Sequence, residues 1–482
     1  MYVGLDLGTS SVKAVLIDEL QQVVGSAGVE LSVARPYDGW SEQDPESWWQ
    51  AALEAVDSLK AHHPKQMAGL KAIGLSGQMH GATLLGSDDR PLRPCMLWND
   101  VRAAKQCAEL QRAEPAFNAR GGNLVMPGFT APKVQWVRER EPDVFAAISK
   151  VLLPKDYIRL KLTGDHASDM SDSSGTLWLD VARRDWDDAL LAATGLDRSH
   201  MPRLVEGTEI SGTLLPGLCR RWGISGTPVI AGGAGDNAAA ACGIGAVTPG
   251  SAFMSLGTSG VLFATNDRFS PNIADGVHAM CHALPGTWHQ MGVILSATDS
   301  LNWLADVLKM SPAGLTGSLR DVEAPADVLF LPYLGGERTP HNDADIRGAF
   351  CGLSHNSDEA GLTHAVLDGV AFALRDCKRA LEVGGTSIDR LTVVGGGSNS
   401  GIWLKIIANV LKCPVELPED GSIGAAMGAA RLGQVAAGQS VSRVFAAPNV
   451  LKVIEPEPEL AEAYEAAYQR WLRFYPAVKS IY

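Results

Sequence analysis

The stretch Leu7-Gly-Thr-Ser-Ser-Val12 recurs in the second half of the chain as Leu256-Gly-Thr-Ser-Gly-Val261. In both copies an apolar run precedes the Gly-Thr-Ser triplet, and a run of apolar and β-branched residues follows it. Each copy therefore predicts a β-hairpin with Gly-Thr-Ser at its tip. Because each copy opens one half of the chain, the repeat predicts two related domains.

The two predicted tips are candidate phosphate-binding loops. A glycine permits backbone torsions closed to other residues, and Thr and Ser add hydroxyl donors beside exposed backbone N–H groups. Taken alone, either copy is more readily an ordinary hairpin turn. Two such tips facing each other would hold a polyphosphate, so the presence of both favours phosphate binding. The candidate residues are Gly8, Thr9, Ser10, Gly257 and Thr258.

The length of the chain agrees with two domains, because 482 residues exceed what a single hydrophobic core supports. Strand-like and helix-like segments alternate, which predicts an α/β fold of two lobes with a central cleft. Apolar stripes predict helices after Asp44-Pro45, from Leu362 to Leu381 and from Pro458 to Leu472. Gly and Pro residues gather at 243–251. We therefore expect an N-terminal lobe over residues 1–245 and a C-terminal lobe over residues 246–482.

Composition narrows the class of protein. The formal charge is −13 with no basic block, which argues against a nucleic-acid partner. The eight cysteines show neither CxxC pairs nor metal-ligand spacing, as expected of reduced cysteines in a cytosolic protein. The first residues enter a strand without a signal-peptide pattern, and the longest small-apolar stretch, Ala238 to Val247, is far shorter than the roughly 20 residues that span a bilayer. We expect a cytoplasmic protein with no membrane partner.

Two acidic residues lie at places suited to phosphate chemistry. Asp6 ends the first strand beside the first tip, where a carboxylate could hold Mg²⁺ through water. Its counterpart in the second copy is Ser255, so one metal is expected. Asp236 follows a glycine cluster and precedes an alanine-rich helix, which is equally typical of an N-cap. A helix N-terminus also keeps the carboxylate ionised, and phosphoryl transfer to a hydroxyl group needs such a proton acceptor.

Three further loops carry candidate binding residues. Gln78, Met79 and His80 follow a predicted strand and could contact a polyol, although a lone His is usually a structural residue. Trp98 and Asp100 place a polar group beside an aromatic ring, which is typical of sugar sites and also of ordinary loops.

The third loop contains Gly396 and Gly397, which connect a predicted strand to a helix that begins near Ser400. Exposed N–H groups at such a helix start could bind an anion or a nucleotide. The alternative is a tight strand-to-helix connection, and the glycine spacing is not that of a dinucleotide-binding fingerprint.

Several longer stretches complete a resemblance to a known family. These stretches are Trp40 to Glu46 with Trp48-Trp49, Gly77 to Thr83, Trp98 to Asp100, Gly122-Asn123, Met126 to Lys133, Leu153 to Tyr157, Ser168 to Asp172, Gly235 to Ala239, Ser255 to Gly260 and Gly336 to Asn342. In this order, over nearly the whole chain, the sequence resembles the FGGY carbohydrate kinases of the actin/Hsp70/hexokinase ATPase superfamily. Within that family it is most similar to members that phosphorylate D-xylulose.

The resemblance implies two ribonuclease H-like lobes with ATP in the cleft and the sugar held mainly by the first lobe. It implies that Asp236 is the proton acceptor, that Asp6 and Asp236 lie near Mg²⁺, and that Asn237 contacts the sugar. Met79 and His80 match the sugar loop, the two tips match the phosphate hairpins, and Gly396 and Gly397 match glycines near the base and ribose. Where several members have Asn, this chain has Gly401, so no side-chain contact to adenine is expected there.

The activity implied by the resemblance is ATP-dependent phosphorylation of D-xylulose to D-xylulose 5-phosphate. One alternative is a kinase for another sugar or polyol, such as ribulose, gluconate or glycerol. A second is a protein of the same fold that binds nucleotide without phosphorylating anything, for which Asp236 and a sugar loop would be superfluous. A homodimer is left open.

Overall fold

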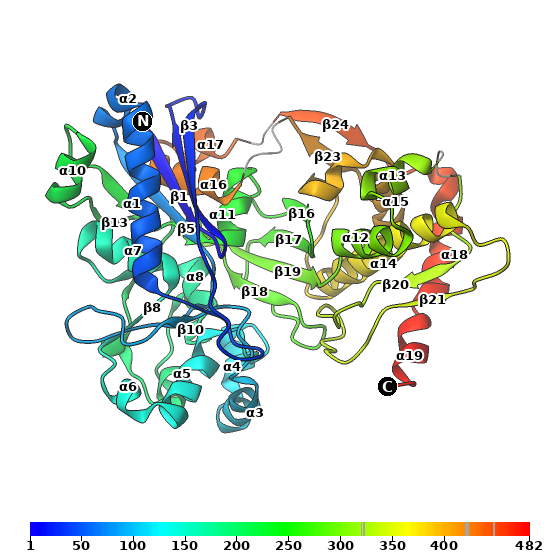
Figure 1. Cartoon of the computed structure of the whole chain (residues 1–482), viewed down its shortest axis with the longest axis horizontal. Coiled ribbons are helices and arrows are strands. Elements are labelled where there is room, and N and C mark those ends of the chain that lie inside the picture. Colours follow the sequence, from blue (N-terminus) through cyan, green and yellow to red (C-terminus); the bar gives the residue numbers. More distant parts are fainter. Residues whose placement is uncertain (320, 322, 420–423, 447–448) are drawn as a thin grey trace.

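The chain forms two α/β lobes, each built on a seven-stranded sheet (Figure 1). This computed structural model describes residues 1–319, 321, 323–419, 424–446 and 449–482. The N-terminal lobe lies on the left of the view and the second sheet on the right. The predicted fold class, an α/β fold of two ribonuclease H-like lobes, is confirmed.

The first sheet has the strand order β13-β14-β5-β1-β2-β3, with β15 also paired to β5. Its strands are β1 (Tyr2–Leu7), β2 (Ser11–Ile17), β3 (Val23–Glu30), β5 (Ala72–Gly77), β13 (Ile210–Thr213), β14 (Val229–Ala231) and β15 (Ala234–Gly235). The strand β1 pairs antiparallel with β2 and parallel with β5.

The second sheet has the order β18-β19-β17-β16-β22-β23-β24. Its strands are β16 (Ala252–Leu256), β17 (Gly260–Asn266), β18 (His278–Cys281), β19 (Trp288–Ile294), β22 (Leu391–Val394), β23 (Val415–Pro418) and β24 (Val450–Ile454). The strand β16 pairs antiparallel with β17 and parallel with β22, as β1 does with β2 and β5. Both predicted hairpins are therefore present, and they occupy matching places in the two sheets.

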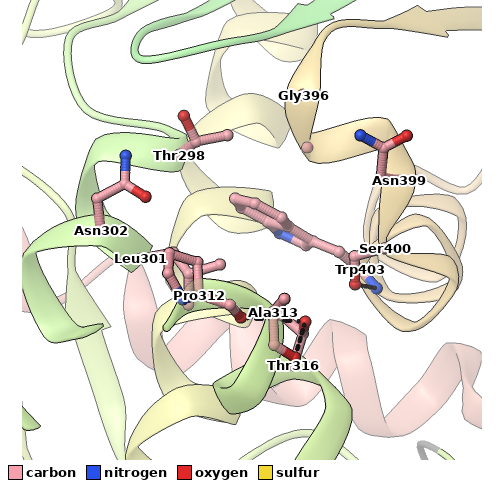
Figure 2. A pocket seen from close by; sticks show the side chains of 11 residues that line it. Thr298, Leu301, Asn302, Pro312, Ala313, Thr316, Gly396, Asn399, Ser400 and Trp403 are labelled. Atoms are coloured by element: carbon pink, nitrogen blue, oxygen red, sulfur yellow. Dashed lines mark hydrogen bonds between the residues drawn. The ribbon is translucent and has the colours of Figure 1, made fainter. Parts of the chain in front are cut away.

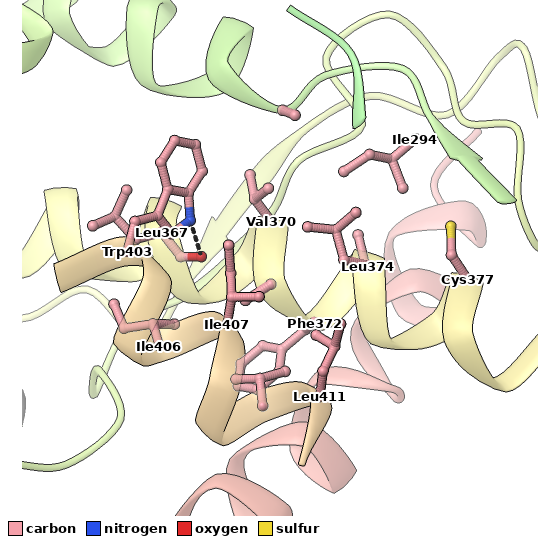
Figure 3. Packing of buried hydrophobic residues seen from close by; sticks show 14 of the residues in the cluster. Ile294, Leu367, Val370, Phe372, Leu374, Cys377, Trp403, Ile406, Ile407 and Leu411 are labelled. Carbon is pink, nitrogen blue, oxygen red and sulfur yellow. Dashed lines mark hydrogen bonds between the residues drawn. The ribbon is translucent and has the colours of Figure 1, made fainter. Parts of the chain in front are cut away.

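The predicted helices are also present. Helix α1 (Pro45–His62) begins after Asp44, whose carboxylate accepts a hydrogen bond from the backbone N–H of Glu46 over 3.0 Å. Helix α14 (Glu359–Val383) carries the predicted apolar stripe and packs on α15 (Gly401–Leu411). Figure 3 shows Trp403 of α15 hydrogen-bonded to the carbonyl oxygen of Leu367 on α14, above their apolar contact surface. Helix α18 (Ala461–Trp471) covers most of the third predicted segment.

The remaining elements are short or connect the sheets. The other helices are α2 (Pro64–Ala68), α3 (Ala104–Ala113), α4 (Ala116–Gly121), α5 (Thr130–Arg140), α6 (Pro142–Ala146), α7 (Pro154–Thr163), α8 (Met170–Ser174), α9 (Asp188–Ala193), α10 (Pro216–Trp222), α11 (Asp236–Gly243), α12 (Thr298–Leu308), α13 (Pro312–Ser318), α16 (Ala425–Ala436), α17 (Val441–Val444) and α19 (Phe474–Lys479). Short 3₁₀ turns lie at η1 (Arg198–His200), η2 (Gly396–Asn399) and η3 (Pro458–Leu460). Small sheets pair β4 (Glu42–Gln43) with β7 (Cys95–Met96), β6 (Thr83–Leu85) with β8 (Lys150–Leu152), β9 (Ala167–Asp169) with β12 (Arg203–Val205), β10 (Leu179–Asp180) with β11 (Asp185–Trp186) and β20 (Leu329–Leu331) with β21 (Ala349–Cys351).

One helix from the second half of the sequence packs on the first lobe. Helix α16, orange in Figure 1, lies against β1, β5 and α11. A Cβ atom at Gly74 would stand 1.7 Å from the carbonyl oxygen of Ala429, and one at Gly428 would stand 1.8 Å from that of Ala239. Only glycine permits this approach. A division of the chain near residue 245 assigns α16 to the C-terminal lobe by sequence, but its packing is on the first lobe. We therefore propose that the first lobe comprises residues 1–245 together with α16.

None of the helices in the part of the chain that the structure describes is both long and apolar enough to cross a membrane.

Candidate active site

Residues of both lobes line one large cavity of about 770 Å³, within the range of small-molecule sites. The lining residues are Met79, His80, Trp98, Asn99, Val101, Met126, Pro127, Gly128, Phe129, Asp236, Asn237, Thr258, Ser259, Val261, His278, Met280, Met291, Val293, Leu295 and Arg338. The cavity thus brings together Asp236, the second hairpin tip and most of the expected sugar contacts.

Asp236 is the first residue of α11, and its N-cap is Gly235. The interpretation of Asp236 as an N-cap is therefore wrong. Its Oδ1 accepts hydrogen bonds from the backbone N–H of Asn237 over 2.7 Å and from Asn237 Nδ2 over 3.0 Å. Burial, and to a lesser extent the charge of Asp6, raises the pKa of Asp236 to about 7. A carboxyl group with this pKa on a cavity wall is suited to accept a proton from a hydroxyl group.

Asp6, near the end of β1, accepts a hydrogen bond at Oδ1 from Ser76 Oγ over 2.9 Å. Burial raises the pKa of Asp6. The charge of Asp6 contributes to the raised pKa of Asp236, so the two carboxylates lie close enough to interact. The residues that the structure describes include no group of three or more His, Cys, Asp or Glu that could enclose a metal. One or two carboxylates, with phosphate and water oxygens completing the shell, is the usual protein environment of Mg²⁺.

Met79 and His80 both line the cavity, as predicted for sugar contacts. Met79 packs tightly on the glycine before the catalytic candidate, since a Cβ atom at Gly235 would stand 2.8 Å from Met79 Sδ. His80 Nδ1 donates to the carbonyl oxygen of Gly175 over 2.8 Å. Burial lowers the pKa of His80 to about 3, so the ring is neutral and its Nε2 is a hydrogen-bond acceptor.

Gln78 does not line the cavity and is almost fully buried. Its Nε2 donates to Gln43 Oε1 over 3.0 Å, and its Oε1 accepts from Thr9 Oγ1 over 3.0 Å. Gln43 also donates to the carbonyl oxygen of Thr9 over 2.8 Å. The two buried amides thus hold the first hairpin tip, so we propose that Gln78 positions Thr9 in place of the expected sugar contact.

The first tip reaches the cavity wall through Trp98. The indole N–H of Trp98 donates to Thr9 Oγ1 over 3.0 Å, and half of the Trp98 side chain remains exposed. The tip itself is closed by a hydrogen bond from the N–H of Gly8 to the carbonyl oxygen of Ser11 over 3.0 Å, which leaves Ser10 exposed.

Asp100 also lies outside the cavity lining. It is fully buried, and Arg102 donates to both of its carboxylate oxygens. Asp100 Oδ2 accepts from the backbone N–H of Ser41 over 2.7 Å as well. These partners occupy the carboxylate, so we propose that Asp100 holds the loop that presents Trp98 and Asn99.

The second hairpin tip lines the large cavity and is hydrogen-bonded to a residue of a smaller one. Thr258 and Ser259 line the large one. The backbone N–H of Thr298 donates to the carbonyl oxygen of Gly257 over 2.9 Å, and Thr298 lines a smaller cavity of about 390 Å³. A phosphate chain held at this tip would therefore reach both cavities.

The smaller cavity contains the predicted glycine loop. Gly396 and Gly397 line it, together with Thr298, Leu301, Asn302, Pro312, Ala313, Thr316, Asn399, Ser400 and Trp403. In Figure 2 the indole ring of Trp403 lies centrally, with Thr298 and Gly396 on one side and Ala313 and Thr316 on the other. A largely apolar lining with a tryptophan ring and two side-chain amides would suit a nucleotide base. The amides of Asn302 and Asn399 are present here, although Gly401 offers none.

Four polar residues of the large cavity were not among the predicted site residues: Asn99, Ser259, His278 and Arg338. His278 stands on β18, and its Nδ1 bonds Asn123 Oδ1 over 2.8 Å. Arg338 comes from the loop after β20. The sequence gives no local signal for His278 or Arg338, apart from the resemblance of the stretch Gly336 to Asn342.

The loop that carries Arg338 is held by the C-terminal helix α19. The ring of His341 stacks on Tyr475, with ring centroids 3.5 Å apart. Asp343 Oδ2 accepts hydrogen bonds from Tyr475 Oη and Lys479 Nζ, each over 2.8 Å. Helix α19 thus holds the loop from which Arg338 reaches the cavity.

A buried ionic cluster lies behind Asp236. Lys155 Nζ contacts Asp156 and Asp169 at 2.7 Å and Asp172 at 2.9 Å, and all four side chains are at most 1% exposed. Burial raises the pKa of Asp172, against the charge of Lys155. The cluster reaches the backbone beside Asp236 through Ser171.

Comparisons with known proteins agree over the whole chain. The N-terminal domain of the FGGY family of carbohydrate kinases matches residues 1–243, and the C-terminal domain of that family matches residues 252–437. The sequence is 47% identical to xylulose kinase of Escherichia coli (strain K12) over 471 residues, covering 97% of this chain and 96% of that protein.

Solved structures give the same result. A xyloylose kinase from Brucella ovis superposes with a TM-score of 0.98 at 56% identity, covering 100% of both chains. Xylulose kinase from Rhodospirillum rubrum superposes with a TM-score of 0.90 at 28% identity, covering 100% of this chain and 99% of that one.

Proposed function

Because this chain belongs to the FGGY family of carbohydrate kinases, we propose that it transfers the γ-phosphoryl group of ATP to the 5-hydroxyl group of D-xylulose, with Asp236 as general base. The observation that supports this most directly is the large cavity that Asp236 and the second hairpin tip share. The similarity to xylulose kinases over almost the whole chain favours D-xylulose as the sugar.

In the proposed reaction the sugar lies along Met79 and His80 with its terminal hydroxyl group at Asp236. The Asp236 carboxylate accepts the hydroxyl proton while the sugar oxygen forms a bond to the γ-phosphorus atom. The bond from that phosphorus to the β,γ-bridging oxygen breaks, and ADP leaves. Asn237 holds the carboxylate through its backbone and side-chain N–H groups, which fixes the oxygen that receives the proton.

The nucleotide is proposed to lie with its base in the smaller cavity beside Gly396 and Gly397. Its phosphates would pass Gly257 and Thr258 towards Gly8, Thr9 and Ser10 of the facing lobe. Backbone N–H and hydroxyl groups at these tips stabilise the charge that develops on the transferred phosphoryl group.

Asp6 and Asp236 are the residues that would hold Mg²⁺, through water and phosphate oxygens. When bound, the ion neutralises negative charge on the β- and γ-phosphates. The charges of the two carboxylates interact, and no group of three or more His, Cys, Asp or Glu residues among the described residues could hold a metal. This arrangement fits Mg²⁺, which usually keeps several water ligands.

The experiment that tests the proposal offers D-xylulose, D-ribulose, gluconate and glycerol separately with Mg-ATP and identifies the products by mass. We expect D-xylulose 5-phosphate as the main product. Preferred phosphorylation of another compound would replace D-xylulose by that substrate. ADP release that is independent of any sugar would instead support an ATPase without a sugar acceptor.

A further inference from the structure

Phosphorylation of a 2-ketopentose at its 5-hydroxyl group requires the open-chain sugar. A ring of this sugar closes when the 5-hydroxyl oxygen attacks the C2 carbonyl group, so the cyclic form has no free 5-hydroxyl group. The reactive form therefore carries a free carbonyl oxygen, which can only accept hydrogen bonds. This requirement rests on the proposed function, and it means that the cavity must supply a donor at the C2 position.

Several polar groups of the cavity already donate to other residues. His80 donates its Nδ1–H to Gly175, which leaves Nε2 as an acceptor. Trp98 donates its indole N–H to Thr9. The side-chain amide of Asn237 donates one of its two N–H groups to Asp236.

His278, like His80, carries its proton on Nδ1. Asn123 Nδ2 donates to the carbonyl oxygens of Gly121 and Ala279, over 2.8 Å and 3.1 Å, so Asn123 Oδ1 is an acceptor. The Nδ1–H of His278 therefore donates to Asn123 Oδ1, and Nε2 of His278 accepts. Both histidines are suited to the hydroxyl hydrogens of a sugar and not to its carbonyl oxygen.

Arg338 provides uncommitted donors at the same end of the cavity. Within the described ranges no Asp or Glu oxygen lies within 4.0 Å of its guanidinium group, and its Nη1 lies 2.7 Å from Met126 Sδ. The charge of Arg338 lowers the pKa of His80 and of His278, which places the guanidinium near both rings. A half-buried guanidinium group on the wall of a cavity, with no anion beside it, has N–H groups that can donate to a bound ligand.

The backbone on both sides of Arg338 is fixed to the end of β19. Glu337 Oε1 accepts from the N–H groups of Leu295 and Arg338, over 3.0 Å and 2.7 Å. Thr339 exchanges two hydrogen bonds of 3.0 Å with Val293, one from its N–H and one to its Oγ1. The guanidinium therefore starts from a rigid base on the second lobe and faces the sugar loop of the first.

We propose that Arg338 donates a hydrogen bond to the C2 carbonyl oxygen of the open-chain sugar and thereby selects ketoses over the corresponding polyols. Asn99, Asn237, Thr258 and Ser259 also carry N–H or O–H groups on the cavity lining, but these donors are neutral, and a hydrogen bond from a charged donor is the stronger one. Replacing Arg338 should remove recognition of the carbonyl group and leave recognition of the hydroxyl groups intact.

The test compares Arg338→Met with the unmodified protein for binding of D-xylulose, xylitol and D-arabinitol without nucleotide, measured by isothermal titration calorimetry. The two pentitols keep the carbon chain but replace the carbonyl group by a hydroxyl group. Loss of a hydrogen bond to a charged donor should weaken D-xylulose binding by roughly 10- to 100-fold. Binding of the pentitols should change by less than about threefold, because their hydroxyl groups find other partners.

Two matched variants make the outcome specific. Arg338→Lys should restore part of the preference for D-xylulose, and Asn99→Ala should weaken the ketose and the pentitols alike. Equal weakening of all three ligands by Arg338→Met, with an unchanged melting temperature and KM for ATP, would overturn the role of Arg338. Failure of the unmodified protein to bind or phosphorylate D-xylulose would instead overturn the proposed function.

Discussion

The backbone N–H of Gly235 donates a hydrogen bond to Ser171 Oγ over 3.1 Å, so the residue before Asp236 is held by a helix that precedes it by a large distance in the sequence. Ser171 Oγ in turn donates to Asp169 Oδ2 over 2.5 Å. We expect Ser171→Ala to lower kcat by about 2- to 10-fold, the value of one hydrogen bond, without a change in KM for ATP.

The matched control for Ser171 is Ser173→Ala. Ser173 is equally buried in α8, but its Oγ donates to Ser168 Oγ over 2.9 Å and not to the backbone beside Asp236. Steady-state kinetics should show a lower kcat for Ser171→Ala and an unchanged kcat for Ser173→Ala. An equal fall in kcat for both would mean that the effect comes from packing in general.

Asp236 should set the lower limb of the pH profile. Its pKa is raised to about 7, and only the ionised form accepts a proton. kcat/KM for the sugar should therefore fall towards tenfold per pH unit below that value and level off above it, with a lower midpoint when Mg-ATP is bound. Asp236→Asn should lower kcat by about 10²- to 10⁴-fold. A variant that kept most of its activity would exclude Asp236 as the base.

The same carboxyl group should make stability depend on pH. A carboxyl group whose pKa is higher in the folded than in the unfolded protein contributes stability at low pH and loses it as pH rises through the folded pKa. Asp236→Asn should therefore gain melting temperature relative to the unmodified protein as pH rises from about 4 to about 7, the interval between the unfolded pKa of 3.8 and the folded pKa of about 7. A difference in melting temperature that is independent of pH would contradict the raised pKa.

Lys155 should be essential for stability. Lys155→Met leaves the carboxylates of Asp156, Asp169 and Asp172 buried without their shared cation. Breaking a buried ionic cluster in this way costs about 3–5 kcal/mol in the free energy of unfolding. Because the remaining carboxyl groups can take up protons, the deficit should shrink as pH falls. Urea denaturation at pH 5 and pH 8 measures it, and a deficit that grew at low pH would contradict the account.

Gly428 should tolerate no side chain. A Cβ atom at this position would stand 1.8 Å from the carbonyl oxygen of Ala239, so Gly428→Ala must push α16 away from α11. Overpacking of this kind costs about 1–3 kcal/mol or more, and it should also lower kcat because α11 begins at Asp236. Gly226→Ala is the control, since no atom lies within 4 Å of the added carbon. Similar melting temperatures for both variants would argue against the tight helix crossing.

The smaller cavity can be tested by filling it. Ala313→Phe should occupy part of its approximately 390 Å³ and raise KM for ATP about tenfold or more, a loss of roughly 1.4 kcal/mol in binding, while binding of the sugar stays unchanged. Gly317→Ala on the same helix α13 adds a carbon that meets no atom within 4 Å, and it should leave KM for ATP unaffected. A larger effect on KM for the sugar than on KM for ATP would contradict the proposal that the smaller cavity binds the nucleotide base.

The hairpins, the main helices and the start of a helix at Asp236 could be predicted from the sequence, because each depends on residues close together in the chain. Glycine-rich tips and apolar periodicity are local signals. The burial of Gln78 and Asp100 could not be predicted, because it depends on their hydrogen bonds to Gln43 and Arg102, which the sequence around each residue does not indicate. The packing of α16 on the first sheet could not be predicted either, since the sequence of an Ala- and Gly-rich helix does not indicate which sheet it will cover.

The return of α16 to the first sheet also constrains how the protein is made. The chain emerges from the ribosome from its N-terminus, yet the face of β1 and β5 that α16 covers stays bare until residues 425–436 have been synthesised. A nascent chain that ends near residue 245 should therefore need protection from aggregation, and the two halves should mature together late in translation.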